Sequence, residues 1–306
     1  MVTRRHTGVL VLAVALVLFG AAGAASHPAA THAFPVTIAA ANGKVTLDAK
    51  PVRIVSLSPT ATEDLFAIGA GPQVVAVDDQ SNYPANAPRT KLSGFTPNVE
   101  AIAGYRPDLV VISNDTNGLV AALGKLKIPV LLEPAAANLS GAYAQIRQLG
   151  RATGRDAAAG SLVARLGGQV DAIVGSLPRG GRKLAVYHEL GPDFYSATSH
   201  TFIGRVYSLL GLRNIADAAD KSGSGYPKLS AEYIVGADPD LIVLSDTLCC
   251  AQTAAKVKAR PGWATIAAVK DGGIVGVSDD VASRWGPRIV DFMRTVAKAV
   301  RTVEGK

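Results

Sequence analysis

Several features that would narrow the function are scarce or missing in this 306-residue sequence. Cysteine occurs only twice, which excludes a small domain held together by disulfides. Charged residues make up 18% of the chain and hydrophobic residues 48%, a balance that excludes intrinsic disorder. The formal charge is +7, but the basic residues are scattered singly and form no block or aromatic-basic stripe. This pattern argues against nucleic-acid binding.

The sequence also lacks the common signatures of catalysis. It contains no G-x-S-x-G elbow, P-loop, H-E-x-x-H motif or dinucleotide fingerprint. The neighbouring carboxylates Asp78 and Asp79 favour a solvated turn over an acid/base pair, because adjacent side chains point in different directions. His188 is well placed for a site, but a lone histidine does not make a metal centre. We therefore expect a protein that is not an enzyme, with no metal site and no cofactor.

The first 25 residues have the pattern of a secretory signal. Arg4 and Arg5 precede an apolar run over 9–19, and small residues follow at 20–25. The run is too short for a stable membrane-spanning helix, so we expect cleavage after Ala24 or Ala25 and export of the mature chain. A membrane anchor that stays attached is the alternative. We expect no lipid anchor, because no cysteine lies near the cleavage site, and the 29 basic and 24 acidic residues that remain give a charge of +5.

Export also bears on Cys249 and Cys250, which are adjacent. In an oxidising compartment they can pair only with each other or with another chain. A disulfide between neighbours closes a very small, strained ring and gains little from loop entropy. Two alternatives follow: a vicinal disulfide that presents a flat, polarisable face to a ligand, or a pair of free thiols.

A repeated segment indicates two lobes of similar architecture. Residues 98–113 read NVEAIAGYRPDLVVIS, and residues 230–245 read SAEYIVGADPDLIVLS. Each copy predicts a short helix with a glutamate in its first turn, a break at proline, and then a strand. The strands, 109–112 and 241–244, are continuous apolar runs, which is typical of parallel sheets covered on both faces.

Alternating strands and helices surround both copies of the repeat. The expected strands are 53–57, 74–77, 109–112 and 130–132 in the first lobe, and 184–187, 241–244 and 274–277 in the second. The expected helices are 62–68, 99–103, 119–126, 202–210, 254–259 and 287–303. Asn42 and Gly43 predict a hairpin within 37–49. Alternation of this kind predicts a doubly wound α/β fold.

A segment with helical spacing joins the two lobes. Its apolar residues recur every three or four positions over 156–177, and Pro178 ends it. At about 1.5 Å per residue the helix is roughly 30 Å long and can run along both lobes. We predict an α/β protein of two Rossmann-like lobes with central parallel sheets, joined by a single long helix. The expected boundaries are a signal peptide over 1–25, an N-terminal lobe over 26–154, the connecting helix over 155–178 and a C-terminal lobe over 179–306.

The residues that follow the expected strands predict a binding cleft, because ligands of open α/β sheets bind beyond the carboxyl ends of the strands. Several of these residues are aromatic, although aromatic residues are only 6% of the chain. They favour a flat, sizeable ligand, with packing under the loops as the alternative for any single ring. The candidate ligand-binding residues are Gln80, Tyr83, Phe95 and Asn114 in the first lobe, and Phe194, Tyr195, Tyr226, Cys249, Cys250, Arg284 and Trp285 in the second.

Several segments resemble the substrate-binding proteins of ABC importers for iron complexes and cobalamin. They are RIVSLSPTATEDLFAIGAG at 53–71, SNYP at 81–84, the two repeated E-x-I-x-x-x-x-P-D-L segments, and SRWGPRIVDF at 283–292. The resemblance covers about 51 to 300. It implies two Rossmann-like lobes bridged by one long helix that moves little on binding. It also implies capture of a ligand outside the membrane and delivery to a permease driven by a cytoplasmic ATPase.

Within that family the sequence resembles the cobalamin binders most closely. The resemblance places Gln80, Asn114, Tyr226 and Arg284 where those binders contact the corrinoid. Gln80 and Asn114 stand where aromatic residues are common in the cobalamin binders. A corrinoid or related metal chelate is therefore the expected ligand. The alternatives are a ferric siderophore, which the positive charge suits because many such chelates are anionic, haem, or a secreted enzyme on the same scaffold.

The resemblance also implies a protein partner. Glu100 and Glu232 occupy the same place in the two repeats, in the first turn of a helix, where the helix dipole stabilises a carboxylate. In the resembled family, two such glutamates dock into arginine pockets on the two permease subunits, and arginine pairs with carboxylates in a bidentate fashion. We expect Glu100 and Glu232 to dock a monomeric binding protein onto a permease dimer.

Overall fold

The computed structural model describes residues 1–3, 34–178, 180 and 182–305. The signal predicted over 1–25 lies, apart from residues 1–3, outside the described residues. Within the described part of the chain, no helix is long and apolar enough to cross a membrane. Two parallel sheets form the centre of one compact unit that spans residues 31–306.

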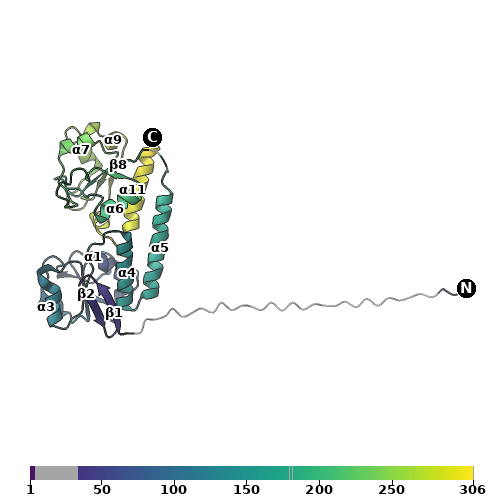
Figure 1. Cartoon of the computed structure of the whole chain (residues 1–306), viewed down its shortest axis with the longest axis vertical. Coiled ribbons are helices and arrows are strands. Elements are labelled where there is room, and N and C mark those ends of the chain that lie inside the picture. The colour runs from purple at the N-terminus through teal and green to yellow at the C-terminus, as the bar shows by residue number, and fades with distance from the viewer. Residues whose placement is uncertain (4–33, 179, 181, 306) are drawn as a thin grey trace. The chain divides into compact units, whose positions relative to one another are not determined.

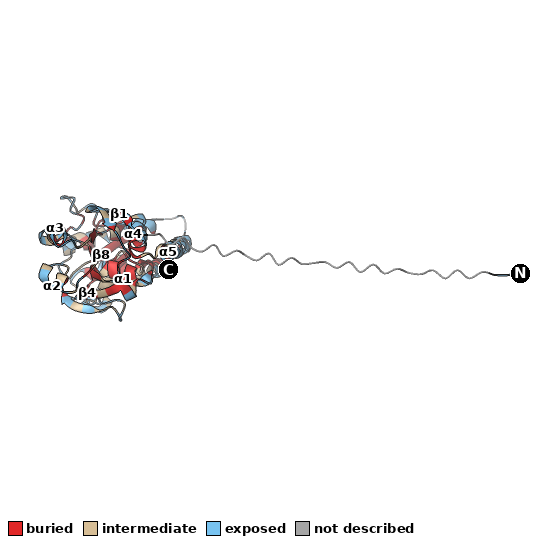
Figure 2. Ribbon diagram, turned by 90° about the horizontal axis from the view of Figure 1, so that it is seen from below, coloured by how far each residue is buried: buried red, intermediate tan, exposed pale blue. Residues whose placement is uncertain are grey.

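The N-terminal sheet has five parallel strands in the order β5-β4-β3-β6-β7. They are β3 (Ile54–Leu57), β4 (Val74–Asp78), β5 (Arg89–Leu92), β6 (Leu109–Ile112) and β7 (Val130–Leu132). The helices of this lobe are α1 (Pro59–Ala67), α2 (Val99–Gly104), α3 (Leu119–Lys125) and α4 (Leu139–Thr153). Figure 2 shows α1 buried along most of its length, whereas only Ile102 of α2 is buried.

The hairpin predicted around Asn42 is confirmed and covers one edge of this sheet. Its strands, β1 (Val36–Ala40) and β2 (Gly43–Leu47), pair in antiparallel register, and Gly43 takes a φ of +104° in the turn. The Asn42 side chain donates to the Val130 carbonyl (2.9 Å) and accepts from the Leu132 amide (3.1 Å). The amide side chain thus satisfies backbone groups that the edge strand β7 would otherwise leave open.

The C-terminal sheet has four parallel strands in the order β11-β10-β8-β9. They are β8 (Ala185–Glu189), β9 (Arg213–Asn214), β10 (Leu241–Leu244) and β11 (Ile274–Gly276). The helices are α6 (Phe202–Leu209), α7 (Ala231–Ala237), α8 (Ala254–Lys258), α9 (Ala267–Lys270), α10 (Asp279–Ser283) and α11 (Ile289–Glu304). The predicted α/β class with two parallel-sheet lobes is confirmed.

The repeated segment has the same local structure in both lobes. Its helices, α2 and α7, are N-capped by Asn98 and Ser230, and each is followed by a buried strand, β6 or β10. The aspartate of the P-D-L motif has a shared role. Asp108 accepts hydrogen bonds from the backbone amides just before β3, and Asp240 accepts one from the Ala185 amide at the start of β8. The motif therefore joins the starts of two neighbouring parallel strands.

The long helix α5 (Asp156–Gly175) lies against both α4 and α11, as Figure 1 shows. Its buried residues include Leu162, Leu166 and Val170, as the spacing predicts. Close approach between α4 and α5 depends on Gly150, because a Cβ at that position would lie 2.4 Å from the Cβ of Ala159. Packing by both flanking helices therefore holds α5 in place.

Five helices and strands of the structure were not predicted: α4, α9, α10, β5 and β9. Helix α4 contains two glycines, which lower intrinsic helix propensity, and its stability comes from packing on α5. The strands β5 and β9 are short and mostly polar, so neither has the apolar run that marks the central strands.

Two glycine substitutions test the role of α5. Gly168 is exposed within α5, and a Cβ added there would meet no atom within 4 Å, so Gly168→Ala is expected to stabilise the fold by about 0.5 to 1 kcal/mol. Gly150→Ala is expected to destabilise it, because the new methyl collides with Ala159. Urea unfolding measures the free energy of unfolding of both variants. A change in the same direction for both would contradict this packing.

Candidate functional site

The loops at the carboxyl ends of the strands carry the exposed aromatic side chains. Among the described residues, the exposed aromatics are Tyr83 (46%), Phe95 (72%), Tyr195 (43%) and Tyr226 (49%). They lie in the loops that follow β4, β5, β8 and β9, respectively. All four are residues that the sequence predicts to bind ligand. We call these segments, together with 245–253 after β10, the rim loops.

A buried polar contact between the lobes, which we call the lobe bridge, brings the two sets of loops together. Arg284, which follows α10, donates to Glu63 Oε1 of α1 at 2.9 Å and to Asp280 Oδ1 at 2.7 Å. Asn82, after β4, donates to Asp280 Oδ2 at 2.7 Å, and Arg288 donates through Nε to Glu63 Oε2 at 2.9 Å. Glu63 is 2% exposed and Arg284 7% exposed. Helix α1 and the loop after β4 are therefore joined to the segment 280–288 that follows β11.

Arg284, one of the residues predicted to bind ligand, has protein partners from both lobes. Its two terminal nitrogens also donate to the Asn82 side chain (3.0 Å) and the Gln80 carbonyl (2.9 Å), so each has two protein partners. Arg284 thus holds the lobes together, and its main partner, Glu63, was missed because nothing in the local sequence links residues 221 positions apart. Trp285 is half-buried and donates from Nε1 to Gln145 Oε1 (2.8 Å) on α4, a further contact between the lobes.

The polar candidates of the N-terminal lobe, Gln80 and Asn114, both have exposed side chains in loops after β4 and β6. Tyr83 lies under the Arg288 guanidinium, 4.3 Å from ring centroid to cation. With Phe66 and Pro287 it lines a cavity of about 380 Å³ beside the lobe bridge. Phe95 is the most exposed aromatic residue of the described part of the chain.

In the C-terminal lobe, two rim loops pair with each other. Tyr195 and Lys228 form an antiparallel bridge, which is extended by hydrogen bonds from Ser196 N to Pro227 O (3.0 Å) and from Thr198 N to Gly225 O (2.8 Å). Tyr195 and Tyr226, 31 positions apart in the sequence, are brought together by this pairing. The sequence shows each tyrosine but not the ladder that aligns them.

Phe194 has a different role from its neighbour. Its backbone φ is +68°, which is unusual for a bulky residue, and its half-buried ring lies 5.3 Å from the Arg260 guanidinium and 5.8 Å from Trp263. Arg260 also lies over Trp263 at 4.5 Å. Phe194 therefore packs into the base of the loop, and its conformation turns the next residue, Tyr195, outward.

Two buried carboxyl groups lie beneath these loops. Glu189, at the end of β8, receives two hydrogen bonds of 2.6 Å from the terminal nitrogens of Arg260. Asp246 follows β10 and is fully buried, and neither carboxyl oxygen has a partner among the described residues. Burial, and then the charge of Glu189, raise the pKa of Asp246 to about 7. The loop 245–253 thus begins at a carboxyl group that is only partly ionised near neutral pH.

Cys249 and Cys250 are free thiols in the structure, without the vicinal disulfide that was one of the two alternatives. Asp279 accepts hydrogen bonds from the Leu248 amide (2.9 Å) and the Cys249 amide (2.8 Å), which fixes the turn. A hydrogen bond with Cys250, followed by burial and Asp279, raises the pKa of Cys249 to about 12. The Cys249 thiol is therefore protonated at neutral pH.

His188 is a packing residue of the C-terminal core. It is fully buried, with Nδ1 2.6 Å from the Tyr207 hydroxyl and Nε2 3.1 Å from the Ser245 hydroxyl. Burial lowers its pKa to about 3, so the ring is neutral. Within the described residues, no group of three or more His, Cys, Asp or Glu side chains could hold a metal ion.

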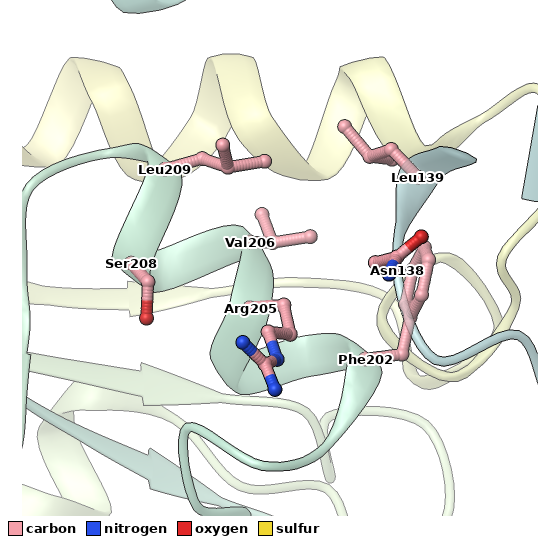
Figure 3. Close-up of a pocket in the computed structure, with 7 residues that line it drawn as sticks. All are labelled: Asn138, Leu139, Phe202, Arg205, Val206, Ser208 and Leu209. Carbon is pink, nitrogen blue, oxygen red and sulfur yellow. The ribbon is translucent and has the colours of Figure 1, made fainter. Parts of the chain in front are cut away.

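A smaller cavity of about 240 Å³ lies between α6 and the start of α4. Figure 3 shows Leu139, Val206 and Leu209 near one another, with the Arg205 guanidinium turned away from them. None of the four exposed aromatic residues lines it. Its volume is below the usual range for a drug-sized ligand, so we do not assign the main site to it.

Residues 54–281 match the periplasmic binding protein family. This chain belongs to that family. Its relatives include the cobalamin-binding protein of Halobacterium salinarum, which is 35% identical over 96% of this chain and 84% of the relative. An ABC transporter substrate-binding lipoprotein of Bacillus subtilis is 32% identical over 88% of this chain and 87% of the relative.

The family's solved structures support the fold. A possible iron-binding, periplasmic solute-binding protein from Staphylococcus epidermidis superposes with a TM-score of 0.70 at 28% identity, covering 82% of this chain and 99% of that one. The resemblance inferred from the sequence is therefore confirmed. Membership of a periplasmic binding protein family implies a location outside the cytoplasm and a role in transport.

The buried carboxyl of Asp246 predicts a pH dependence of stability. Its pKa is about 7 in the folded protein, above the ordinary value of 3.8, so folding loses stability as the pH rises from about 4 through 7. Asp246→Asn is expected to remove this loss, and the variant should gain stability relative to the parent at pH 8 but not at pH 4. Thermal unfolding across this range, with exposed Asp48→Asn as the control, measures the difference. If the difference in stability between Asp246→Asn and the parent is the same at every pH, the pH dependence does not come from Asp246.

Proposed function

We propose that this protein captures a corrinoid, cobalamin or a close relative, outside the membrane and delivers it to an ABC permease. The observation that carries the proposal is the gathering of four exposed aromatic residues in loops at the carboxyl ends of the strands of both lobes. A corrin ring is flat and broad, and aromatic side chains contact such a ring efficiently. The cobalamin-binding relative, aligned over 96% of this chain, supports the corrinoid in particular.

Haem is the second candidate ligand. Tyr195 and Tyr226 have partly exposed hydroxyl-bearing side chains, and tyrosine is a known axial ligand of haem iron. Cobalamin supplies axial ligands to its own cobalt and needs no such ligand from the protein, whereas haem leaves the axial positions of its iron open. A ferric siderophore suits the basic chain, as the sequence predicts.

We also propose where the protein acts, in which oligomeric state, and how its lobes are bounded. The segment over 1–25 is a cleaved signal without a lipid anchor, and the mature protein acts as a monomer. The N-terminal lobe over 26–154 and the C-terminal lobe over 179–306 are joined by the connecting segment 155–178. The Bacillus relative is a lipoprotein, so mass spectrometry of the exported protein tests the lipid-free part of the proposal.

Ligand titration tests the function. Isothermal titration with cyanocobalamin, haemin and a panel of ferric siderophores is expected to give saturable binding of cyanocobalamin at one site per chain. Phe95→Ala and Tyr226→Ala are each expected to weaken that binding by about tenfold, because each removes a large aromatic contact. Leu126→Ala, an exposed apolar residue outside the rim loops, is the matched control. Unchanged cyanocobalamin affinity in both aromatic variants would contradict the proposed site. Binding of haemin and of no other tested ligand would show that the ligand is haem and not a corrinoid.

Glu100 and Glu232 are the residues that we propose dock the protein onto the permease. Glu100 and Glu232 are exposed in the first turns of α2 and α7, the helices that begin just after the rim loops carrying Phe95 and Tyr226. A hydrogen bond to the first turn's own backbone and one with Ser230 lower the pKa of Glu232, which keeps it ionised. Each lobe thus presents one carboxylate close to its aromatic residue.

A double variant tests docking. Glu100→Ala combined with Glu232→Ala is expected to leave cyanocobalamin affinity unchanged but to reduce transport by the reconstituted permease, most strongly at low salt, where charges are least screened. The control removes two exposed carboxylates elsewhere, Asp48→Ala with Glu304→Ala. Normal transport by the first double variant would exclude Glu100 and Glu232 from the docking surface.

A further inference from the structure

The paired rim loops of the C-terminal lobe place a cation beside two tyrosines. In the ladder, Tyr195 lies opposite Lys228, and Tyr226 is two positions from Lys228 along the same segment. Residues two apart in an extended segment share a face, and burial alternates accordingly: 226 and 228 are exposed, whereas 227 and 229 are buried. Tyr195, Tyr226 and Lys228 therefore lie on one exposed face, which we call the tyrosine-lysine face.

The ammonium group of Lys228 is available to a ligand. It lies 5.7 Å from the centroid of the Tyr195 ring, and the described residues offer it no carboxylate within salt-bridge distance. The nearby acidic residue in the same loop, Asp220, is engaged by the amides of Ser224 (3.0 Å) and Gly225 (2.7 Å). These bonds lower the pKa of Asp220 and hold the loop that precedes Tyr226.

A cation held over an aromatic ring is positioned for a ligand that has both a flat part and an anionic part. The tyrosine rings contact the flat part, and the ammonium group pairs with the anion through a charge-assisted hydrogen bond. Cobalamin has both, because a phosphodiester in its nucleotide arm carries a single negative charge. Cobinamide has the same corrin ring but lacks the nucleotide and its phosphodiester.

We propose that Lys228 on the tyrosine-lysine face binds the phosphodiester of the corrinoid's nucleotide arm and so selects complete cobalamins over cobinamide. This inference rests on the corrinoid function proposed above and adds a specificity-determining residue to it. Lys228 is the counter-charge, and Tyr195 positions it.

The test compares two ligands and three variants. Cyanocobalamin and dicyanocobinamide are titrated against the parent protein, Lys228→Gln, Lys228→Arg and the control Lys221→Gln, which removes an exposed lysine from the same loop. Lys228→Gln is expected to weaken cyanocobalamin about fivefold and to leave dicyanocobinamide unchanged. Lys228→Arg keeps the charge and is expected to retain most of the affinity, and Lys221→Gln is expected to have no effect.

Salt gives an independent readout. Cyanocobalamin affinity of the parent is expected to fall between 50 mM and 500 mM NaCl, whereas that of Lys228→Gln is expected to stay nearly constant. Equal effects of Lys228→Gln on the two corrinoids, or no effect on either, would overturn the role of Lys228 while leaving the corrinoid function intact. Failure of the parent protein to bind either corrinoid would instead overturn the proposed function, and the inference with it.

Discussion

The buried ion pair between Glu63 and Arg284 determines how the two lobes face each other. Both side chains are removed from water, and each charge is balanced by more than one partner, so loss of either residue would leave a buried charge unpaired. Helix α5 fixes the distance between the two sheets through its packing on α4 and α11. This packing alone would still allow the two lobes to rotate relative to each other. The lobe bridge removes that freedom by joining the loop after β4 to the segment after β11.

The repeat explains why both lobes contribute similar groups to one site. In each lobe, a rim loop with an exposed aromatic residue leads into a capped short helix with a glutamate in its first turn, and then into a central strand. The aspartate at the start of that strand, Asp108 or Asp240, ties it to its neighbour in the sheet. One structural unit, used twice, therefore presents in each lobe an exposed aromatic residue followed by an exposed glutamate.

Much of this arrangement could be predicted from the sequence. Central strands such as 109–112 and 241–244 are apolar on both faces, and that pattern depends only on burial in a parallel sheet. Helix α4 could not be predicted, because its glycine at 150 serves contact with Ala159 and not helix formation. The sequence identified the exposed aromatic residues as candidates for ligand binding, because the loops that follow parallel strands meet at one edge of a sheet. The contact between Arg284 and Glu63 could not be predicted, because the two residues are distant in the sequence and only the fold joins them.

The position of cobalt in a crystal of the complex with cyanocobalamin tests whether the ligand binds between the lobes. Anomalous scattering from crystals grown with cyanocobalamin locates the metal without reference to the protein chain. A single cobalt is expected between the rim loops of the two lobes, with Phe95 on one side and Tyr226 on the other. A cobalt on an outer face of either lobe, or in the cavity between α6 and the start of α4, would contradict binding between the lobes.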